Sequence, residues 1–263
     1  MTLRSQTKRP IAALAGLCLC AAWLSAQAQK PRKASAPPVR AAEAPAPFRA
    51  GEKLDYSVQW AKLLNAATVR MAIVERRPFY GREAWHFQSR ASTIDLMRLL
   101  FELDDQFDSY TEPSTLASLQ YEMYLREQGK KEDSIFRMTT QDDPAPGVGS
   151  AVRVLPGTRD PLGFFYSLRT VDWQQTREAR VPVFDGKKLY EVRARLEQLS
   201  GEVSVPAGRF VASRIEVRVF ERGREVAQTR FSVWLARDAG RTPVLMEAEV
   251  PFGSARVALT RVE

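Results

Sequence analysis

The sequence has few of the side chains that enzymes use to hold metals or to form covalent intermediates. Its two cysteines, Cys18 and Cys20, lie within the first 28 residues, and His86 is its one histidine. Without later cysteines, the rest of the chain has no disulfides, thiolate metal sites or cysteine nucleophiles. His86 lies in an expected strand, outside any G-x-S-x-G or H-E-x-x-H motif, so we assign it a structural or solvent-facing role. We expect no metal, no cofactor and no catalytic residues.

The body of the chain also lacks a strong net charge. The 39 basic residues outnumber the 31 acidic ones, but three of the basic residues precede position 29 and five more lie between 29 and 50. From residue 51 on, basic and acidic residues nearly balance. A nucleic-acid-binding domain needs a clustered basic face, so we expect no nucleic-acid partner.

No hydrophobic run is long enough to cross a membrane comfortably. The apolar stretch Ile11–Leu24 is shorter than the roughly 20 residues of a transmembrane helix. Basic residues precede it and the small-x-small sequence Ala26-Gln27-Ala28 follows, which predicts a cleaved signal peptide over residues 1–28 and a periplasmic location. Leucines precede both cysteines where a lipoprotein needs a small residue, so we do not expect a lipoprotein.

Residues 29–50 contain five prolines and seven alanines and few side chains that could build a core. This composition predicts a disordered, partly polyproline, basic arm. It is either a passive tail or an arm that touches anionic headgroups.

From Gly51 to the C-terminus the pattern is that of a single β-rich domain, residues 51–263. Leu54, Tyr56, Val58 and Trp60 alternate with polar residues, which is typical of a half-buried strand. Glycine-containing turns separate the later strands, which favours an antiparallel barrel or sandwich. A short helix is expected from Pro161 to about Thr170. The other expected strands are 66–76, 83–91, 106–111, 118–127, 131–140, 178–184, 187–200, 209–221, 225–236, 243–251 and 254–262.

Ser92–Leu103 is the exception to this alternation. On a helix its polar residues Asp95, Arg98 and Glu102 share one narrow stripe, and apolar residues cover the rest. The spacing of Ser92 and Asp95 predicts a capping box, and Asp104-Asp105 predicts the end of the helix. Such a helix is either buried between the sheet and covering loops or a lid over a hydrophobic groove.

A series of short motifs follows the chain in a fixed order. They are Gly51-Glu52-x-Leu54-x-Tyr56-x-Val58-x-Trp60, Asp160-Pro161-Leu162, Phe165-Tyr166-x-Leu168-Arg169, Val181-Pro182-Val183-Phe184-Asp185-Gly186-Lys187-x-x-Tyr190, Val205-Pro206-Ala207-Gly208-x-Phe210, Val233-Trp234-Leu235, Asp238, Arg241-x-Pro243-Val244 and Gly253. In this order and spacing they resemble, across residues 47–263, the bacterial domain of unknown function 3108 family. The resemblance implies an exported protein with a large, curved antiparallel sheet, and by analogy an unclosed β-barrel akin to periplasmic lipoprotein carriers. For Asp160 and Arg169 it leaves open an ion pair at a pocket mouth, or a helix cap and a cation near the helix C-terminus.

We therefore expect a periplasmic, non-enzymatic module that binds or shuttles a lipid or acylated molecule in an apolar groove. One alternative is an envelope protein–protein interaction module with a filled core, which presents its sheet edge or apolar helix to a protein partner. The other candidate partner is a membrane surface. The least favoured alternative is a carboxylate-dependent hydrolase. It ranks third because nothing in the sequence singles out two acids as a catalytic pair. The expected ligand wall consists of Trp60, Leu96, Met97, Leu100, Phe101, Phe164 and Phe165.

Overall fold

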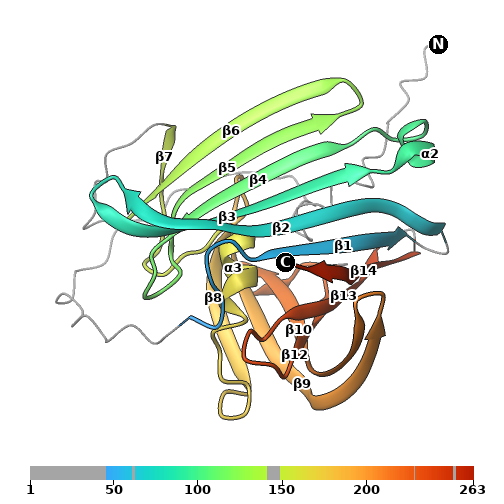
Figure 1. The fold of residues 1–263 in the computed structure, drawn as a ribbon. Helices are drawn as coiled ribbons and strands as arrows, with labels where there is room; N and C mark the ends of the chain where they lie inside the picture. The colour runs from blue at the N-terminus through green and yellow to red at the C-terminus, as the bar shows by residue number, and fades with distance from the viewer. Residues whose placement is uncertain (1–45, 61–62, 141–148, 228, 251–252) are drawn as a thin grey trace.

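The described part of the chain folds into one large sheet with two short helices (Figure 1). The computed structural model describes residues 46–60, 63–140, 149–227, 229–250 and 253–263. The expected signal peptide and most of the expected arm lie outside these residues. Within the described residues, the structure confirms a mainly β fold built on a curved, unclosed sheet.

Two long strands of 17 residues each stand out among the elements. The strands are β1 (Lys53–Trp60), β2 (Leu63–Phe79), β3 (Arg82–Thr93), β4 (Asp104–Thr111), β5 (Ser118–Glu127), β6 (Lys130–Thr139), β7 (Ser150–Arg153), β8 (Glu178–Phe184), β9 (Leu189–Val205), β10 (Gly208–Glu221), β11 (Arg224–Glu225), β12 (Phe231–Ala236), β13 (Pro243–Val250) and β14 (Gly253–Val262). The helices are α2 (Asp95–Arg98) and α3 (Pro161–Ser167).

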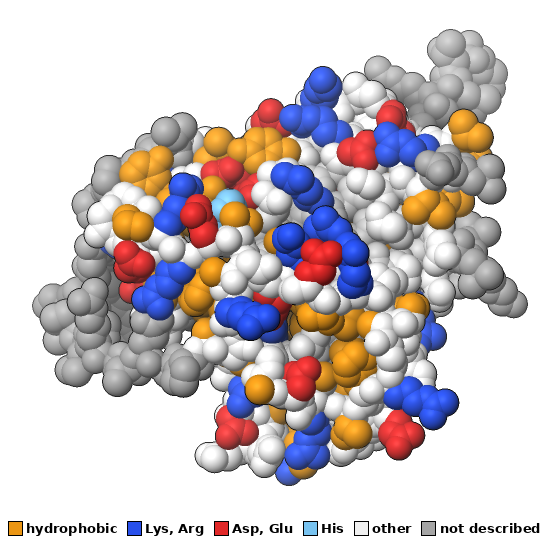
Figure 2. Space-filling model, viewed as in Figure 1, with side chains coloured by type: hydrophobic (Ala, Val, Ile, Leu, Met, Phe, Trp, Pro, Cys, Tyr) orange, Lys and Arg blue, Asp and Glu red, His pale blue; other side chains and the backbone are white. Residues whose placement is uncertain are grey.

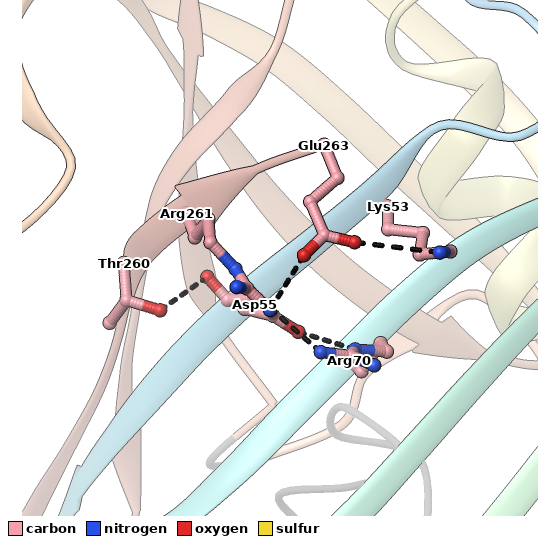
Figure 3. A network of polar contacts seen from close by, with 6 residues as sticks. All are labelled: Lys53, Asp55, Arg70, Thr260, Arg261 and Glu263. Carbon is pink, nitrogen blue, oxygen red and sulfur yellow. Dashed lines mark hydrogen bonds and ion pairs between the residues drawn. The ribbon is translucent and has the colours of Figure 1, made fainter.

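The first strand, β1, pairs with the last strand, β14, and this pair joins the two halves of the sheet. The strand order is β7-β6-β5-β4-β3-β2-β1-β14-β13-β12-β10-β9-β8, and only the β6–β7 pairing is parallel. At the central β1–β14 junction, Asp55 accepts hydrogen bonds from Arg70 at 2.6 Å and from Arg261 at 3.0 Å (Figure 3). The Arg70 hydrogen bond holds the pKa of Asp55 below its usual range. Polar side chains therefore fasten the junction on its outer face.

The sheet stays open between its end strands β7 and β8, but one segment links them. After β7, the N–H of Val154 donates to Thr139 in β6. The N–H of Arg159 then donates to Pro182 in β8, and its carbonyl accepts from Phe184. The chain thus draws the two sheet edges together at one end, and this link was not expected from the sequence.

Tight turns set the register of several hairpins. Tyr80-Gly81, Gln128-Gly129 and Arg222-Gly223 each have two successive residues with positive φ, between 46° and 81°. Consecutive left-handed residues define the type I′ turn, whose twist matches that of the flanking strands. Gly129 and Gly223 thus form two of the glycine-containing turns that were predicted between the later strands.

The main core lies between the inner face of the sheet and α3, which contacts β3, β4 and β8. Tyr166 of α3 stacks on Phe87 of β3 with ring centroids 4.1 Å apart. Phe48 packs edge-on against both rings and is buried. The folded body therefore begins before Gly51, and the prediction that the arm extends to residue 50 is wrong for its last residues.

The helix predicted over Ser92–Leu103 is mostly absent. Ser92 and Thr93 continue β3, where they pair with β2, and α2 is one turn long. Its N-cap is Ile94, with no side-chain cap, so the predicted capping box does not form. Isolated helices of this length are marginal, and the flanking residues gain strand hydrogen bonds on both sides instead. Asp104 and Asp105 begin β4 rather than ending a helix.

Candidate functional site

The connection between β3 and β4, Ile94–Glu102, is called the α2 loop below. It lies at the far end of the β3–β4 hairpin (Figure 1). Two hydrogen bonds between Thr93 and Leu103 close the base of the loop. The N–H of Thr93 donates to the carbonyl of Leu103 at 3.0 Å, and the N–H of Leu103 donates to the hydroxyl of Thr93 at 3.1 Å. Leu103 is buried, so the loop is anchored where it leaves the sheet.

Few contacts hold the loop itself to its neighbours. The N–H of Ile94 donates to Ala66 of β2 at 3.3 Å, and Glu102 accepts from the N–H of Gln128 at 2.9 Å. Arg98 forms ion pairs with Asp104 at 2.6 Å and Glu102 at 2.9 Å. The hydrogen bond from Arg98 holds the pKa of Asp104 below its usual range. The ion pairs are solvent-exposed, and such pairs add little stability.

The apolar side chains of the α2 loop point in two directions. Phe101 is only 8% exposed and belongs to the main core. Leu99 and Leu100 are 83% and 74% exposed, the largest values among the exposed large hydrophobic residues of the described chain. One aromatic ring thus closes the end of the core while two leucines face solvent.

Of the seven residues predicted to form a ligand wall, four belong to the main core or pack against it, and this core extends along the sheet from the α2 end to α3. Phe101, Phe164 and Phe165 are buried in the main core, and Trp60, at the end of β1, is half-buried against it. Met97 is half-buried, and the side chain of Leu96 lies outside the described residues. Leu100 faces solvent, so the prediction that it lines a wall with Phe101 is wrong in this structure. The helical pattern failed there because the segment is not a helix. That the other side chains contact a ligand stays a prediction.

Asp105 is a buried acid beside the base of the α2 loop that the sequence reasoning missed. One oxygen accepts from the N–H of Arg126 at 2.8 Å, and Oδ2 has no hydrogen-bond partner among the described residues. Burial raises the pKa of Asp105 to about 6. The signal was present in the sequence, because Asp105 alternates with the inward-facing Phe107 once the strand is taken to begin at Asp104.

Asp160 fixes the start of α3, as predicted. Its carboxylate accepts from the N–H groups of Leu162 and Gly163, both at 2.9 Å, and from the hydroxyls of Ser109 and Ser118. Burial raises the pKa of Asp160, and these four hydrogen bonds oppose that shift. The N-cap therefore also ties α3 to β4 and β5.

Arg169 follows α3 and is completely buried. Its guanidinium pairs with Glu52 and donates to the carbonyl of Gly240 at 2.8 Å. It also lies 5.1 Å from the ring centre of Phe48. Asp160 and Arg169 thus have separate partners, and an ion pair between them at a pocket mouth is ruled out in this structure. Arg169 joins α3 to the start of β1 and to the turn before β13.

His86 has an acidic partner on the outer face of the sheet. Its Nε2 lies 2.7 Å from Asp108, which also accepts from Gln88 and Gln106, and its ring stacks on Tyr110. Burial raises the pKa of Asp108, but the three hydrogen bonds outweigh it and hold that pKa below its usual range. Figure 2 shows the histidine among acidic and basic side chains on this face. The carboxylate of Asp108 is thus fully engaged.

The described part of the chain lacks two further features. No cluster of three His, Cys, Asp or Glu side chains there is arranged to hold a metal ion. None of the helices in that part is long and apolar enough to cross a membrane.

The fold and its anchors define a class of proteins with a large, β-barrel-like but unclosed sheet. Three solved structures are similar to this chain and each covers 82% of it. They are a β-barrel-like protein of the domain of unknown function DUF1849 from Brucella abortus (11% identity, TM-score 0.49, 98% of that chain), a candidate exported protein with a YmcC-like fold from Bacteroides fragilis (9%, 0.33, 97%) and a candidate lipoprotein from Parabacteroides distasonis (9%, 0.37, 98%). The comparison with curated proteins gave no match.

Residues 55–260 match the family described as protein of unknown function (DUF3108). The match covers most of the chain, so the chain belongs to this family, as its landmarks predicted. It includes both anchors of α3, Asp160 and Arg169, and the whole α2 loop.

Proposed function

We propose that this protein is an exported, non-enzymatic module of the cell envelope that binds a lipid or an acylated molecule at the α2 end of its sheet. The observation that carries the proposal is the position of Phe101. A loop without a helix cap inserts this one ring into the main core, while its neighbours Leu99 and Leu100 stay in solvent. An apolar chain that enters the core here has one ring to displace.

The ligand would take the place of Phe101 as the α2 loop swings outward. The loop is held by two backbone hydrogen bonds beyond its base and by exposed ion pairs, so opening it breaks few contacts. Segments of this kind, with few buried contacts, open more readily than core strands. Trp60 and the half-buried Met97 would then contact the bound chain, and Met97 suits an adaptable lining.

Two of the buried acids, Asp160 and Asp108, are already committed to the fold. Asp160 accepts four hydrogen bonds at the start of α3, and Asp108 accepts three on the outer face. A general acid or base must reach its substrate with a free lone pair or proton. This supports a binding role. The export part of the proposal rests on the basic, apolar and small-x-small pattern of residues 1–28.

The test is native mass spectrometry with lipid extraction on protein purified from the periplasm of an expressing host. We expect a stoichiometric lipid or acylated ligand, which the Met97→Glu variant loses because a charge on the loop opposes an apolar ligand. The matched control is Leu155→Glu, which puts the same charge at an exposed leucine after β7.

A ligand-free protein that also takes up no fluorescent fatty acid would contradict the proposal. Equal loss of ligand in the Met97 and Leu155 variants would place the ligand elsewhere. If the protein is instead recovered with a protein partner that Met97→Glu releases, the α2 end is a protein-interaction site.

A further inference from the structure

We propose that Leu99 and Leu100 form a docking tip that inserts into the headgroup–acyl boundary of a zwitterionic lipid bilayer. The tip is distinct from the ligand site, since both side chains point away from the core that Phe101 enters. The inference is therefore independent of which ligand occupies that core, or whether one does.

Among the described residues, the two most exposed large hydrophobic side chains are neighbours in the chain. Other exposed large hydrophobic residues, such as Leu155 and Val211, occur singly and are 56% and 50% exposed. Leu99 and Leu100 are adjacent, more exposed, and lie at the far end of a hairpin (Figure 1). In Figure 2 hydrophobic side chains reach the surface at the end of the molecule where α2 lies. A paired apolar tip can enter a bilayer without the sheet having to approach it.

The size of the tip favours a lipid surface over a second protein. Two leucine side chains offer on the order of 200 Å² of apolar surface. A stable protein interface buries about 800 Å² on each partner, so the tip alone is too small to hold a dimer. Shallow insertion of a few apolar side chains is, by contrast, enough for weak and reversible membrane contact.

The charges around the tip select the kind of lipid. The α2 loop contains two acids and one base, and that base, Arg98, is engaged by Glu102 and Asp104. The neighbouring β5–β6 turn adds Glu127 and Lys130, one charge of each sign. An anionic membrane attracts clusters of basic residues, which this end lacks in the described residues. Headgroups without net charge therefore suit the tip better.

The experiment is flotation of the exported protein with phosphatidylcholine vesicles, with and without a fraction of phosphatidylglycerol. We expect the wild type to float with pure phosphatidylcholine vesicles. The variant Leu99→Ser/Leu100→Ser should bind these vesicles more weakly, by a factor of roughly ten or more. The control Leu155→Ser/Val211→Ser removes two exposed apolar side chains elsewhere and should bind as the wild type does. All these positions are exposed, so circular dichroism should show unchanged folding.

The insertion of the tip into the bilayer is followed with a single fluorescent label. The chain has no cysteine after Cys20, so Leu100→Cys carries one polarity-sensitive fluorophore on the processed protein, and Val211→Cys carries the control label. Vesicles should shift the emission at position 100 to the blue and leave that at 211 unchanged. Equal shifts, binding that requires phosphatidylglycerol, or serine variants that float like the wild type would overturn the proposal. So would a wild-type dimer that the serine variant dissociates. The ligand content of the serine variant is measured as well. If that variant keeps the ligand but loses membrane binding, the tip and the ligand site are separate.

Discussion

Helix α3 and the α2 loop both interrupt the run of strands, but α3 buries six of its seven residues whereas the α2 loop exposes two adjacent leucines. The start of α3 is capped by Asp160, and Arg169 ties the segment after it to Glu52. The α2 turn has no side-chain cap, and its ion pairs are exposed.

This difference in burial suggests different roles for the two segments, with α3 stabilising the sheet and the α2 loop free to bind in the proposed function. Removing a buried, fully hydrogen-bonded group is strongly destabilising, so the anchors of α3 are expected to contribute to the stability of the sheet. Segments with few buried contacts are the ones that can move and bind. In the proposed function the segment that moves is therefore the α2 loop, and the aromatic residues of α3 stay in the core.

The largest effect is expected at the buried ion pair of α3. Arg169→Met leaves the Glu52 carboxylate without its partner in a mostly buried position, which should lower the free energy of unfolding by about 3–5 kcal/mol. Urea denaturation measures the loss. The double variant Arg169→Met/Glu52→Leu should recover much of it, because no uncompensated charge remains. A single variant as stable as the wild type would show that α3 is not the anchor described.

Phe101→Ala should have the next largest effect. Removing a buried phenylalanine costs about 3–5 kcal/mol in a rigid core, and we expect about 3 kcal/mol here because the loop can partly collapse. The same variant should take up a fluorescent fatty acid more readily, since the displaced ring is gone. Leu100→Ala on the same loop is the control and should change neither quantity. Reduced uptake by Phe101→Ala, in protein that is still folded, would contradict the idea that this ring occupies the ligand's place.

Asp105 makes the stability of the α2 end depend on pH. Burial raises its pKa from 3.8 to about 6, so its contribution to stability is complete below pH 3.8 and is lost as the pH rises through about 6. After allowance for solvent screening, ionisation should cost roughly 2 kcal/mol at neutral pH. Asp105→Asn keeps an acceptor for the N–H of Arg126 and should be more stable than the wild type at pH 7. Urea midpoints at pH 4 and pH 7 provide the check, and an equal difference between the two proteins at both values would reject it.

Much of the fold could be predicted from alternation and turn residues, because strands of this sheet bury one face. The strand from Leu54 to Trp60, the hairpin at Gly129 and the cap at Asp160 all lie where the pattern put them. The α2 loop could not be predicted, because Ser92–Leu103 fits a helix by its own composition. Ser92 pairs with Thr68 of β2 and with Asp104 of β4, and this pairing overrides the helical preference. Both partners lie outside the segment Ser92–Leu103, so its own composition does not reveal them.

The site was harder to predict than the fold for the same reason. Phe101 and Leu100 are neighbours of similar hydropathy, and only the irregular backbone after α2 sends one inward and the other outward. Arg169 could be placed near the end of a helix, but its partner Glu52 is 117 residues away. Long-range partners of charged groups leave no periodic trace in a sequence.

The smallest effect on stability is expected at the tip of the α2 loop. Leu99→Ser/Leu100→Ser removes two side chains that are already in solvent, so the free energy of unfolding should change by no more than about 0.5 kcal/mol. Urea denaturation of this variant should therefore overlay that of the wild type, although its vesicle binding is expected to be roughly tenfold weaker. A destabilisation of 2 kcal/mol or more would mean that the leucines pack against the protein in solution, and the tip would then belong with α3 as part of the core.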